Sequence, residues 1–137
     1  MFQEKITNHA YKLASSTDLG LLPAFWPTIR ENDEHWNLLK DNCKYEFRNY
    51  PFEFHNGGSW SMVNGFFGLA LHSKSKLIEA QTVLEKINHA NSLEEFSFYE
   101  NFNTKTKAPN GVKHCAWSAA AAMLLHQVIN NKFKILA

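Results

Sequence analysis

Apolar residues recur at the spacing of an α-helix in five stretches of this chain. Two of these stretches are apolar on almost every side, which is typical of helices buried by their neighbours. A third lies between them in the sequence and has one apolar and one charged face, so it predicts an outer, half-exposed helix. We therefore expect an all-α fold with about five helices, over residues 2–14, 32–40, 60–72, 75–90 and 115–129.

Two long segments interrupt the helical pattern and are expected to be ordered loops. In residues 17–30, Pro23 and Pro27 stand among apolar residues and exclude a regular helix. Residues 91–113 hold several aromatic residues and a turn signal near their end. Residues 43–54 alternate aromatic and polar types, and a proline there favours an extended loop over a strand.

Composition agrees with a packed, globular chain. Of its 137 residues, 45% are hydrophobic and 14% aromatic, and the net charge is +1. This leaves no basic patch for nucleic acid. The longest weakly polar run, Cys115 to Leu125, is shorter than the ~20 residues that cross a membrane. Two cysteines outside any CxxC pair favour a reducing compartment, so we expect a cytoplasmic protein without nucleic-acid or membrane partners. The seven histidines show no HxxxH or HExxH spacing, so a metal site is not expected. No cofactor is expected either.

The segment from Phe54 to Trp60 is the first with candidate chemistry. His55 and Asn56 offer donors and acceptors that suit hydroxyl groups, and Trp60 offers a flat face on which a sugar ring can stack. Gly57 and Gly58 allow a sharp turn and close approach of the backbone to a ligand. Ser59 is expected to cap the helix that follows. The alternative is a helix-entry turn with core aromatics.

Two further segments carry single candidates. Glu100 stands among aromatic residues in the second loop, where desolvation would suit acid/base chemistry. Its alternative role is that of an exposed loop carboxylate. Trp117 begins the last helix among small residues and could reach a pocket. A nucleophilic pair of His114 and Cys115 is disfavoured, because adjacent residues of a helix point in different directions.

In this order, the three segments resemble the C-terminal part of the neutral/alkaline invertase family of glycoside hydrolases. The family's Tyr-His-Asn-Gly-Gly-Ser-Trp-Pro is similar to residues 54–61, its Glu-Tyr-Tyr-Asp to 100–103, and its Gln-Thr-Trp with small residues to 115–120. More distantly, they resemble trehalases and amylo-α-1,6-glucosidases. Departures from the family pattern include Ser61 for Pro, Asn101 for an aromatic residue and Asn103 for Asp.

The resemblance implies a glycosidase built on an (α/α)6 barrel, with sucrose or another short α-linked sugar as the expected substrate. Glu100 then corresponds to the catalytic base, and the sugar subsite falls on His55, Asn56, Gly57, Gly58, Trp60 and Trp117. An inverting enzyme also needs a general acid, which in the family lies far upstream. Twelve helices need roughly 190 residues, so residues 1–137 are expected to be a single domain that forms the C-terminal portion of such a barrel and is inactive alone.

Partners follow from this interpretation. We expect a small sugar substrate, and either the missing N-terminal part of the barrel or a second copy of the chain. One alternative is a noncatalytic helical interaction module, such as the remnant of a split gene. Another is a trehalase-like or α-glucosidase activity.

Overall fold

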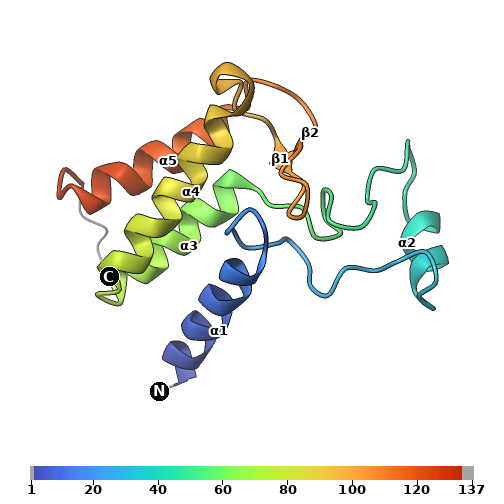
Figure 1. The fold of residues 1–137 in the computed structure, drawn as a ribbon, viewed down its shortest axis with the longest axis horizontal. Helices are drawn as coiled ribbons and strands as arrows, with labels where there is room; N and C mark the ends of the chain where they lie inside the picture. Colours follow the sequence, from blue (N-terminus) through green and yellow to red (C-terminus); the bar gives the residue numbers. More distant parts are fainter. Residues whose placement is uncertain (1, 134–137) are drawn as a thin grey trace.

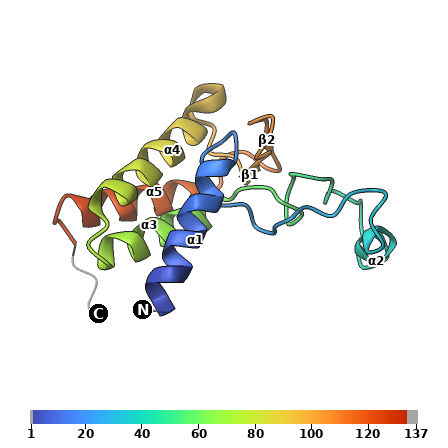
Figure 2. The same ribbon diagram turned by 60° about the horizontal axis from the view of Figure 1, so that its bottom comes forward.

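A computed structural model describes residues 2–133 and shows a helix-rich fold (Figure 1). Helices of regular apolar spacing form a bundle, and a long arm extends from it (Figures 1 and 2). The prediction of a helical chain is confirmed, although a small two-stranded sheet was not expected. The elements within the described residues are α1 (Phe2–Ser16), α2 (Trp36–Asp41), α3 (Ser61–Ser73), α4 (Leu77–Phe96), β1 (Asn101–Phe102), β2 (Pro109–Asn110) and α5 (Ala116–Ile129).

Three helices, α3, α4 and α5, contact one another and hold most of the core. Asn91, in the second half of α4, ties the beginnings of the other two together. Its Oδ1 accepts a hydrogen bond from Ser61 Oγ at 2.9 Å, and its Nδ2 donates to the Ser118 carbonyl at 3.3 Å. Helices α3 and α5 therefore begin at the same end of the bundle, and α4 runs in the opposite direction against both.

Glycines in α3 let it approach α5 closely. A Cβ atom on Gly65 would lie 2.6 Å from Ala121 Cβ, and one on Gly68 would lie 2.4 Å from Leu125 Cδ2. Leu125 is fully buried at this contact. The small residues that break the apolar pattern of α3 therefore have a packing role, because they bring the two helix axes together.

The N-terminal segment covers one side of the bundle. Tyr11 of α1 packs against the core, and the following loop inserts Leu19 and Leu21 into it. Asn64 of α3 holds this loop, since its Oδ1 accepts from the backbone N–H of Leu22 at 2.7 Å. The apolar loop predicted over 17–30 is therefore ordered against the helices.

The arm that extends from the bundle carries α2 (Figure 2). An aromatic cluster stabilises it: the rings of Trp36 and Phe47 meet edge to face at 5.3 Å, and those of Phe47 and Tyr50 at 5.1 Å. Residues 43–54 form loops and turns, apart from isolated bridges of Glu53, so the loop favoured by the proline is confirmed.

Two local predictions were wrong. Helix α4 spans Leu77–Phe96 and so passes the predicted end at residue 90, but its backbone leaves helical geometry at Leu93, and Glu94, Glu95 and Phe96 form a turn with positive φ. Ser59 does not cap α3. The N-cap is Trp60, without a side-chain cap, because the Ser59 hydroxyl donates instead to the Leu22 carbonyl at 3.0 Å.

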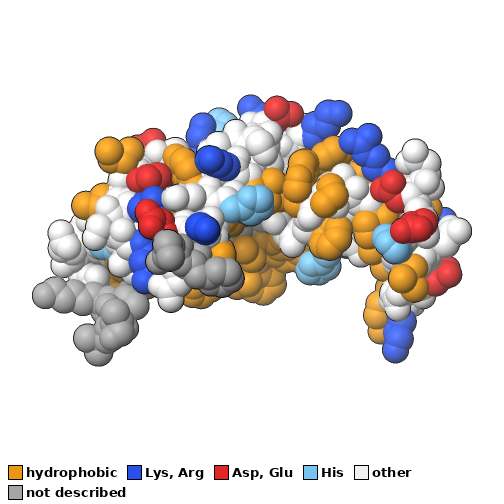
Figure 3. Space-filling view, turned by 90° about the horizontal axis from the view of Figure 1, so that it is seen from below, with side chains coloured by type: hydrophobic (Ala, Val, Ile, Leu, Met, Phe, Trp, Pro, Cys, Tyr) orange, Lys and Arg blue, Asp and Glu red, His pale blue; other side chains and the backbone are white. Residues whose placement is uncertain are grey.

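One face of α3 is apolar and exposed. Met62, Val63 and Phe66 lie on it, and Phe66 keeps 60% of its surface exposed. Seen from below the view of Figure 1, hydrophobic side chains gather in the middle of the molecule (Figure 3). The apolar helix predicted over 60–72 is therefore covered on one side only by the described residues. No helix among residues 2–133 is long and apolar enough to cross a membrane.

Candidate functional site

An aromatic platform stands at the entrance to α3. The His55 imidazole stacks on the Trp60 indole, with ring centroids 5.2 Å apart and planes inclined by 17°. His55 is exposed and Trp60 is half-buried. Trp60 Nε1 points its N–H toward the Phe54 carbonyl at 3.4 Å, which fixes the indole against the loop. Two of the predicted site residues thus form one accessible surface that combines an apolar face with a hydrogen-bonding ring.

Asn56 follows His55 in the sequence, is buried, and has a structural role in the loop. Only 2% of its surface is exposed. Its Oδ1 accepts from the Ile29 N–H at 2.8 Å, and its Nδ2 donates to the carbonyls of Ile29 at 2.8 Å and Asn49 at 3.0 Å. Both amide protons are therefore used within the chain, and Asn56 does not face a sugar bound on the platform.

Gly57 and Gly58 are also buried, and they too have a structural role in the loop. Gly57 has φ +98°, and a Cβ there would lie 2.3 Å from Thr28 Cγ2. At Gly58 a Cβ would lie 2.4 Å from the backbone nitrogen of Phe54. The glycines allow close approach, as expected, but to the chain's own backbone and side chains. They position the platform and do not contact a ligand at it.

Backbone hydrogen bonds join the three predicted segments. The Ser59 N–H donates to the Phe102 carbonyl at 2.8 Å, and the Phe102 N–H donates to the Ser59 carbonyl at 2.9 Å. With ~3.8 Å between successive Cα atoms and ~5.5 Å across such a pair, the Cα atoms of Trp60 and Glu100 lie within about 17 Å of each other. The first two segments are therefore neighbours in the fold.

The third segment joins them through the start of α5. The Cys115 N–H donates to the Phe98 carbonyl at 2.9 Å, and Ser118 Oγ donates to the Tyr99 carbonyl at 2.9 Å. Trp117 lies between these anchors and is 45% exposed. No aromatic contact joins Trp117 to the His55–Trp60 pair within the described part of the chain. The structure brings its segment to the site without placing its ring on the platform.

Glu100 directly precedes β1, and hydrogen bonds to Val112 hold it against the turn that follows β2. Its Oε2 accepts from the Val112 N–H at 3.4 Å, and its backbone N–H donates to the Val112 carbonyl at 3.0 Å. Gly111 has φ +80° and leaves room for the carboxylate, since a Cβ there would lie 2.3 Å from Oε2. The half-buried carboxylate keeps acceptor sites for a water or a hydroxyl.

The negative charge of Glu100 also affects Cys115, at the start of α5. Burial raises the pKa of the Cys115 thiol, and the nearby negative charge of Glu100 adds to this rise. Cys115 is thereby kept as a neutral thiol, which argues against a nucleophilic Cys–His pair at this position.

Sequence reasoning missed the asparagines that support the site. Asn101 is fully buried, and its Oδ1 accepts from the Phe54 N–H at 3.1 Å, which ties the platform loop to β1. Asn103 caps the next turn by accepting from the N–H groups of Lys105 and Thr106, both at 2.9 Å. Asn101 pairs across the ladder with Asn110, and each has an Nδ2 without a hydrogen-bond partner among residues 2–133. The cluster of asparagines directly after Glu100 is the sequence feature that could have revealed this supporting role.

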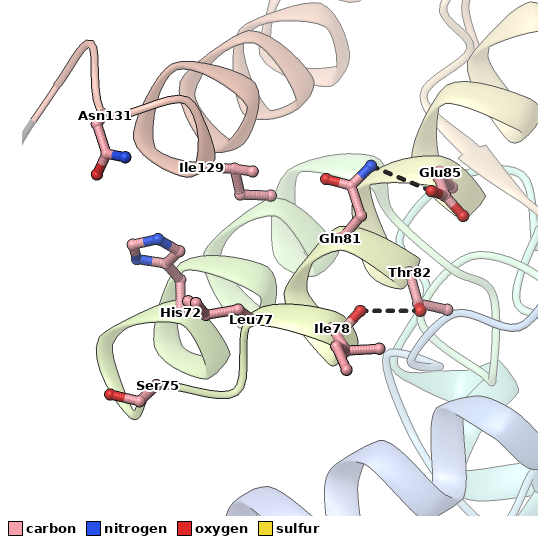
Figure 4. A pocket seen from close by; sticks show the side chains of 9 residues that line it. All are labelled: His72, Ser75, Leu77, Ile78, Gln81, Thr82, Glu85, Ile129 and Asn131. Carbon is pink, nitrogen blue, oxygen red and sulfur yellow. Dashed lines mark hydrogen bonds between the residues drawn. The ribbon is translucent and has the colours of Figure 1, made fainter.

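A groove of about 790 Å³ lies at the other end of the bundle, where α3 gives way to α4 (Figure 4). Leu77, Ile78 and Ile129 give it apolar walls. Gln81 on its rim donates to Glu85 at 3.1 Å. It holds none of the predicted site residues and lies about a full length of α3, ~18 Å, from the platform. We find no set of groups in it that could carry the expected chemistry.

Neither the family models nor the curated proteins compared with this sequence match it. Among residues 2–133, no group of three or more His, Cys, Asp or Glu side chains is arranged to hold a metal ion.

Proposed function

We propose that this chain is the part of an (α/α)6 glycoside hydrolase of the neutral/alkaline invertase type that carries the general base and one sugar subsite. The main support is the convergence of three segments that are far apart in the sequence. The Ser59–Phe102 pair joins the platform loop to β1, and Ser118 joins α5 to the residue before Glu100. These are the segments whose resemblance to the family motivates the proposal.

The helix arrangement supports the proposed barrel type. In a double-layered helical barrel, inner helices run side by side in one direction and outer helices return between them. Helices α3 and α5 begin at the same end and pack through Gly65 and Gly68, while α4 runs back against both. On this proposal α3 and α5 belong to the inner layer and α4 to the outer layer of a partial toroid.

In the proposed reaction, Glu100 removes a proton from the water that attacks the anomeric carbon, and a general acid protonates the leaving oxygen. The Val112 N–H holds one carboxylate oxygen, and the remaining acceptor positions are free to orient the water. The sugar ring would stack on Trp60 and donate or accept hydrogen bonds at His55. The acid, placed upstream by the resemblance, comes from the barrel part that this chain does not contain.

Binding is the step that the chain can be tested for alone. We expect sucrose to give a saturation-transfer NMR signal with the chain, and His55→Ala and Trp60→Ala each to weaken the affinity at least fivefold. His89→Ala is the matched control, because it removes an exposed imidazole from α4. Unchanged affinity in Trp60→Ala would refute the subsite.

Catalysis requires the upstream half. The chain alone should release no monosaccharide from sucrose, trehalose or maltose. Mixed with a barrel half that supplies the acid, it should gain hydrolysis, and Glu100→Gln should abolish the gain while leaving sucrose binding within twofold. A mixture whose activity is unaffected by Glu100→Gln would exclude Glu100 as the base.

A noncatalytic interaction module is the second candidate, and one observation favours it. Met62, Val63 and Phe66 form an exposed apolar face on α3, of a kind that marks protein contacts. If the chain binds no sugar but forms a stable complex through this face, the module is the better description.

A further inference from the structure

A second pocket lies beside the site, between the end of α1 and the loop that precedes the platform. It has a volume of about 200 Å³. It shares no residue with the His55–Trp60 platform or with the Glu100 turn. Residues from four separate stretches of the chain line it: Ser16, Thr17, Asp18, Trp26, Phe52, Thr104 and Lys105.

The walls of this pocket are fixed by hydrogen bonds. Thr104 Oγ1 donates to the Gly57 carbonyl at 2.6 Å, and the Thr104 N–H donates to the Phe52 carbonyl at 3.2 Å. Thr17 Oγ1 accepts from the N–H groups of Gly20 and Leu21 and so closes the turn after α1. The hydroxyls of Thr17 and Thr104 are therefore used for structure, and the pocket keeps its shape without a ligand.

Two aromatic rings form an apolar corner in the pocket. Trp26 and Phe52 have ring centroids 6.3 Å apart with planes tilted by 52°, and Trp26 is 44% exposed. Phe52 has φ +72°, a conformation that costs free energy for a bulky residue. The Phe52 N–H donates to the Asn56 carbonyl at 2.8 Å, so the loop holds this ring in place despite the strain.

Two opposite charges complete the lining. The Asp18 carboxylate is exposed and forms no ion pair with any residue of 2–133. Lys105 Nζ lies over the Phe52 ring, 5.5 Å from its centroid, and within the same residues it also lacks a carboxylate partner. The free groups are thus one acceptor, one donor and an apolar corner.

This combination selects a neutral ring with hydroxyl groups. A hydroxyl can donate to Asp18, another can accept from Lys105, and the C–H face of the ring can pack on Trp26 and Phe52. The opposite charges of Asp18 and Lys105 offset each other, so the lining favours neither a cation nor an anion over a neutral ligand. The volume is below the ~300 Å³ at which pockets for drug-sized ligands begin, so it suits one sugar ring and not a chain of them.

We propose that this pocket is a second, monosaccharide-sized subsite, separate from the His55–Trp60 platform. The choice of a sugar among neutral hydroxylated rings rests on the proposed function. In a glycosidase, such a subsite would hold a ring of a longer substrate or a released sugar.

The four tryptophans allow ligand binding to be monitored separately at the two sites. Their indole N–H signals in a ¹⁵N NMR spectrum report on positions 26, 36, 60 and 117, and the probe is methyl α-D-glucopyranoside added to the full chain. We expect the Trp26 signal to shift in a saturable way. In Asp18→Asn and Lys105→Met the apparent affinity at Trp26 should fall at least fivefold, whereas Lys107→Met should leave it unchanged.

A calorimetric titration with the same sugar tests the aromatic corner. Trp26→Ala should weaken binding at this pocket at least tenfold. Phe25→Ala is the control, because Phe25 is 47% exposed and adjacent but lies outside the pocket. A loss of affinity in Trp26→Ala that Phe25→Ala reproduces would overturn the assignment.

The outcomes separate this subsite from the platform. A shift at Trp26 without one at Trp60 supports the subsite and counts against the platform, and the reverse pattern overturns the subsite alone. If L-phenylalanine or glucose 6-phosphate shifts Trp26 and the methyl glucoside does not, the pocket takes a charged ligand and the proposal is wrong. The proposal is equally wrong if the Trp26 signal does not shift at sugar concentrations up to 100 times the dissociation constant of the platform.

Discussion

Ser59 and Phe102 exchange both of their backbone hydrogen bonds, and both residues are almost completely buried. This single pair connects the loop before α3 with the strand that follows Glu100. It also explains why the hydroxyl of Ser59 is unavailable as a helix cap, since the residue faces the Leu22 carbonyl inside the fold. The geometry of the candidate site therefore depends on a tight turn just before Ser59.

That turn should not tolerate a side chain at Gly58. We expect Gly58→Ala to lower the free energy of unfolding by about 3 kcal/mol, because its Cβ would lie 2.4 Å and 2.6 Å from the backbone N and O of Phe54. Gly20→Ala is the control. Unlike Gly58, Gly20 has a positive φ, but the neighbour that its Cβ would meet is the flexible Lys86 side chain, so we expect a loss of only ~1 kcal/mol. Urea unfolding of both variants tests the difference, and equal losses would contradict it.

Substitutions of Asn56 and His55 should have different effects, the first on stability and the second on sugar binding. Asn56→Ala removes three buried hydrogen bonds and leaves the Ile29 backbone groups unpaired, so we expect a loss of about 3 kcal/mol in unfolding free energy. His55→Ala removes an exposed ring and should cost less than ~1 kcal/mol, while it weakens sugar binding. Denaturation and sucrose titration of both variants check this. A stable Asn56→Ala would show that the amide does not hold the loop.

The sequence predicted helices α3 and α5 to within one residue at each end. Their start signals are local: a run of glycines lies before Ser61, and small apolar residues follow Cys115. The end of α4 was placed too early, because Asn91 is a weak helix former by itself and its hydrogen bonds inside the bundle are made with Ser61 and Ser118, which are distant in the sequence. The left-handed turn there accompanies contacts with residues distant in the sequence, including Lys113 at 3.4 Å from Glu94.

For the candidate site, the sequence pointed to three segments that hydrogen bonds join in the fold, but it did not reveal the structural roles of several of their residues. His55 and Trp60 are neighbours through a short turn, so their pairing could be expected. The burial of Asn56 could not, because its partner Ile29 lies 27 residues away. The pocket at Trp26 was also missed, since its lining comes from four stretches that only the folded chain brings together.

Gly68 and Leu125 should be strongly coupled. Gly68→Ala alone should cost ~1–3 kcal/mol through overpacking, because the new Cβ would lie 2.4 Å from Leu125 Cδ2. Leu125→Ala alone should cost ~2–5 kcal/mol by leaving a cavity. In the double variant the methyl group enters the vacated space, so the combined loss should be smaller than the two added together. Additive losses would show that α3 and α5 do not meet at this point.

Glu94 should make part of the stability depend on pH. The Tyr99 hydroxyl donates to Glu94 Oε2 at 2.6 Å, and this hydrogen bond, followed by the one from Lys113, lowers the pKa of the carboxyl from 4.5. A carboxyl with a lowered pKa stabilises the fold above its unfolded pKa, and the contribution is lost as the pH falls through the folded value.

Tyr99→Phe should therefore raise the pKa of Glu94 toward 4.5 and flatten the decrease of stability below that pH. A ¹³C NMR titration of the Glu94 carboxyl, with urea unfolding at several pH values, measures both effects. Lys113→Met should raise the same pKa by a smaller amount, since its hydrogen bond is the weaker cause. An unchanged titration of Glu94 in Tyr99→Phe would refute the role of the hydroxyl.

The exposed face of α3 should drive association of the purified chain. Met62, Val63 and Phe66 lie side by side on it, and each large apolar side chain left in water forgoes ~1.5–3 kcal/mol. We expect the chain to run above its monomer mass of 15.8 kDa in size exclusion with light scattering. Phe66→Glu should shift it toward the monomer, because a buried, unpaired carboxylate opposes any contact made there.

Leu38→Glu is the matched control for this experiment. Leu38 is 62% exposed, compared with 60% for Phe66, but it lies on α2 in the arm. The same charge added there should leave the mass unchanged, because a single exposed apolar residue needs no partner. If both variants dissociate the chain equally, net charge and not the α3 face controls association. If the unmodified chain is a monomer at millimolar concentration, the α3 face is stable in water and needs neither a second copy nor another barrel part to cover it.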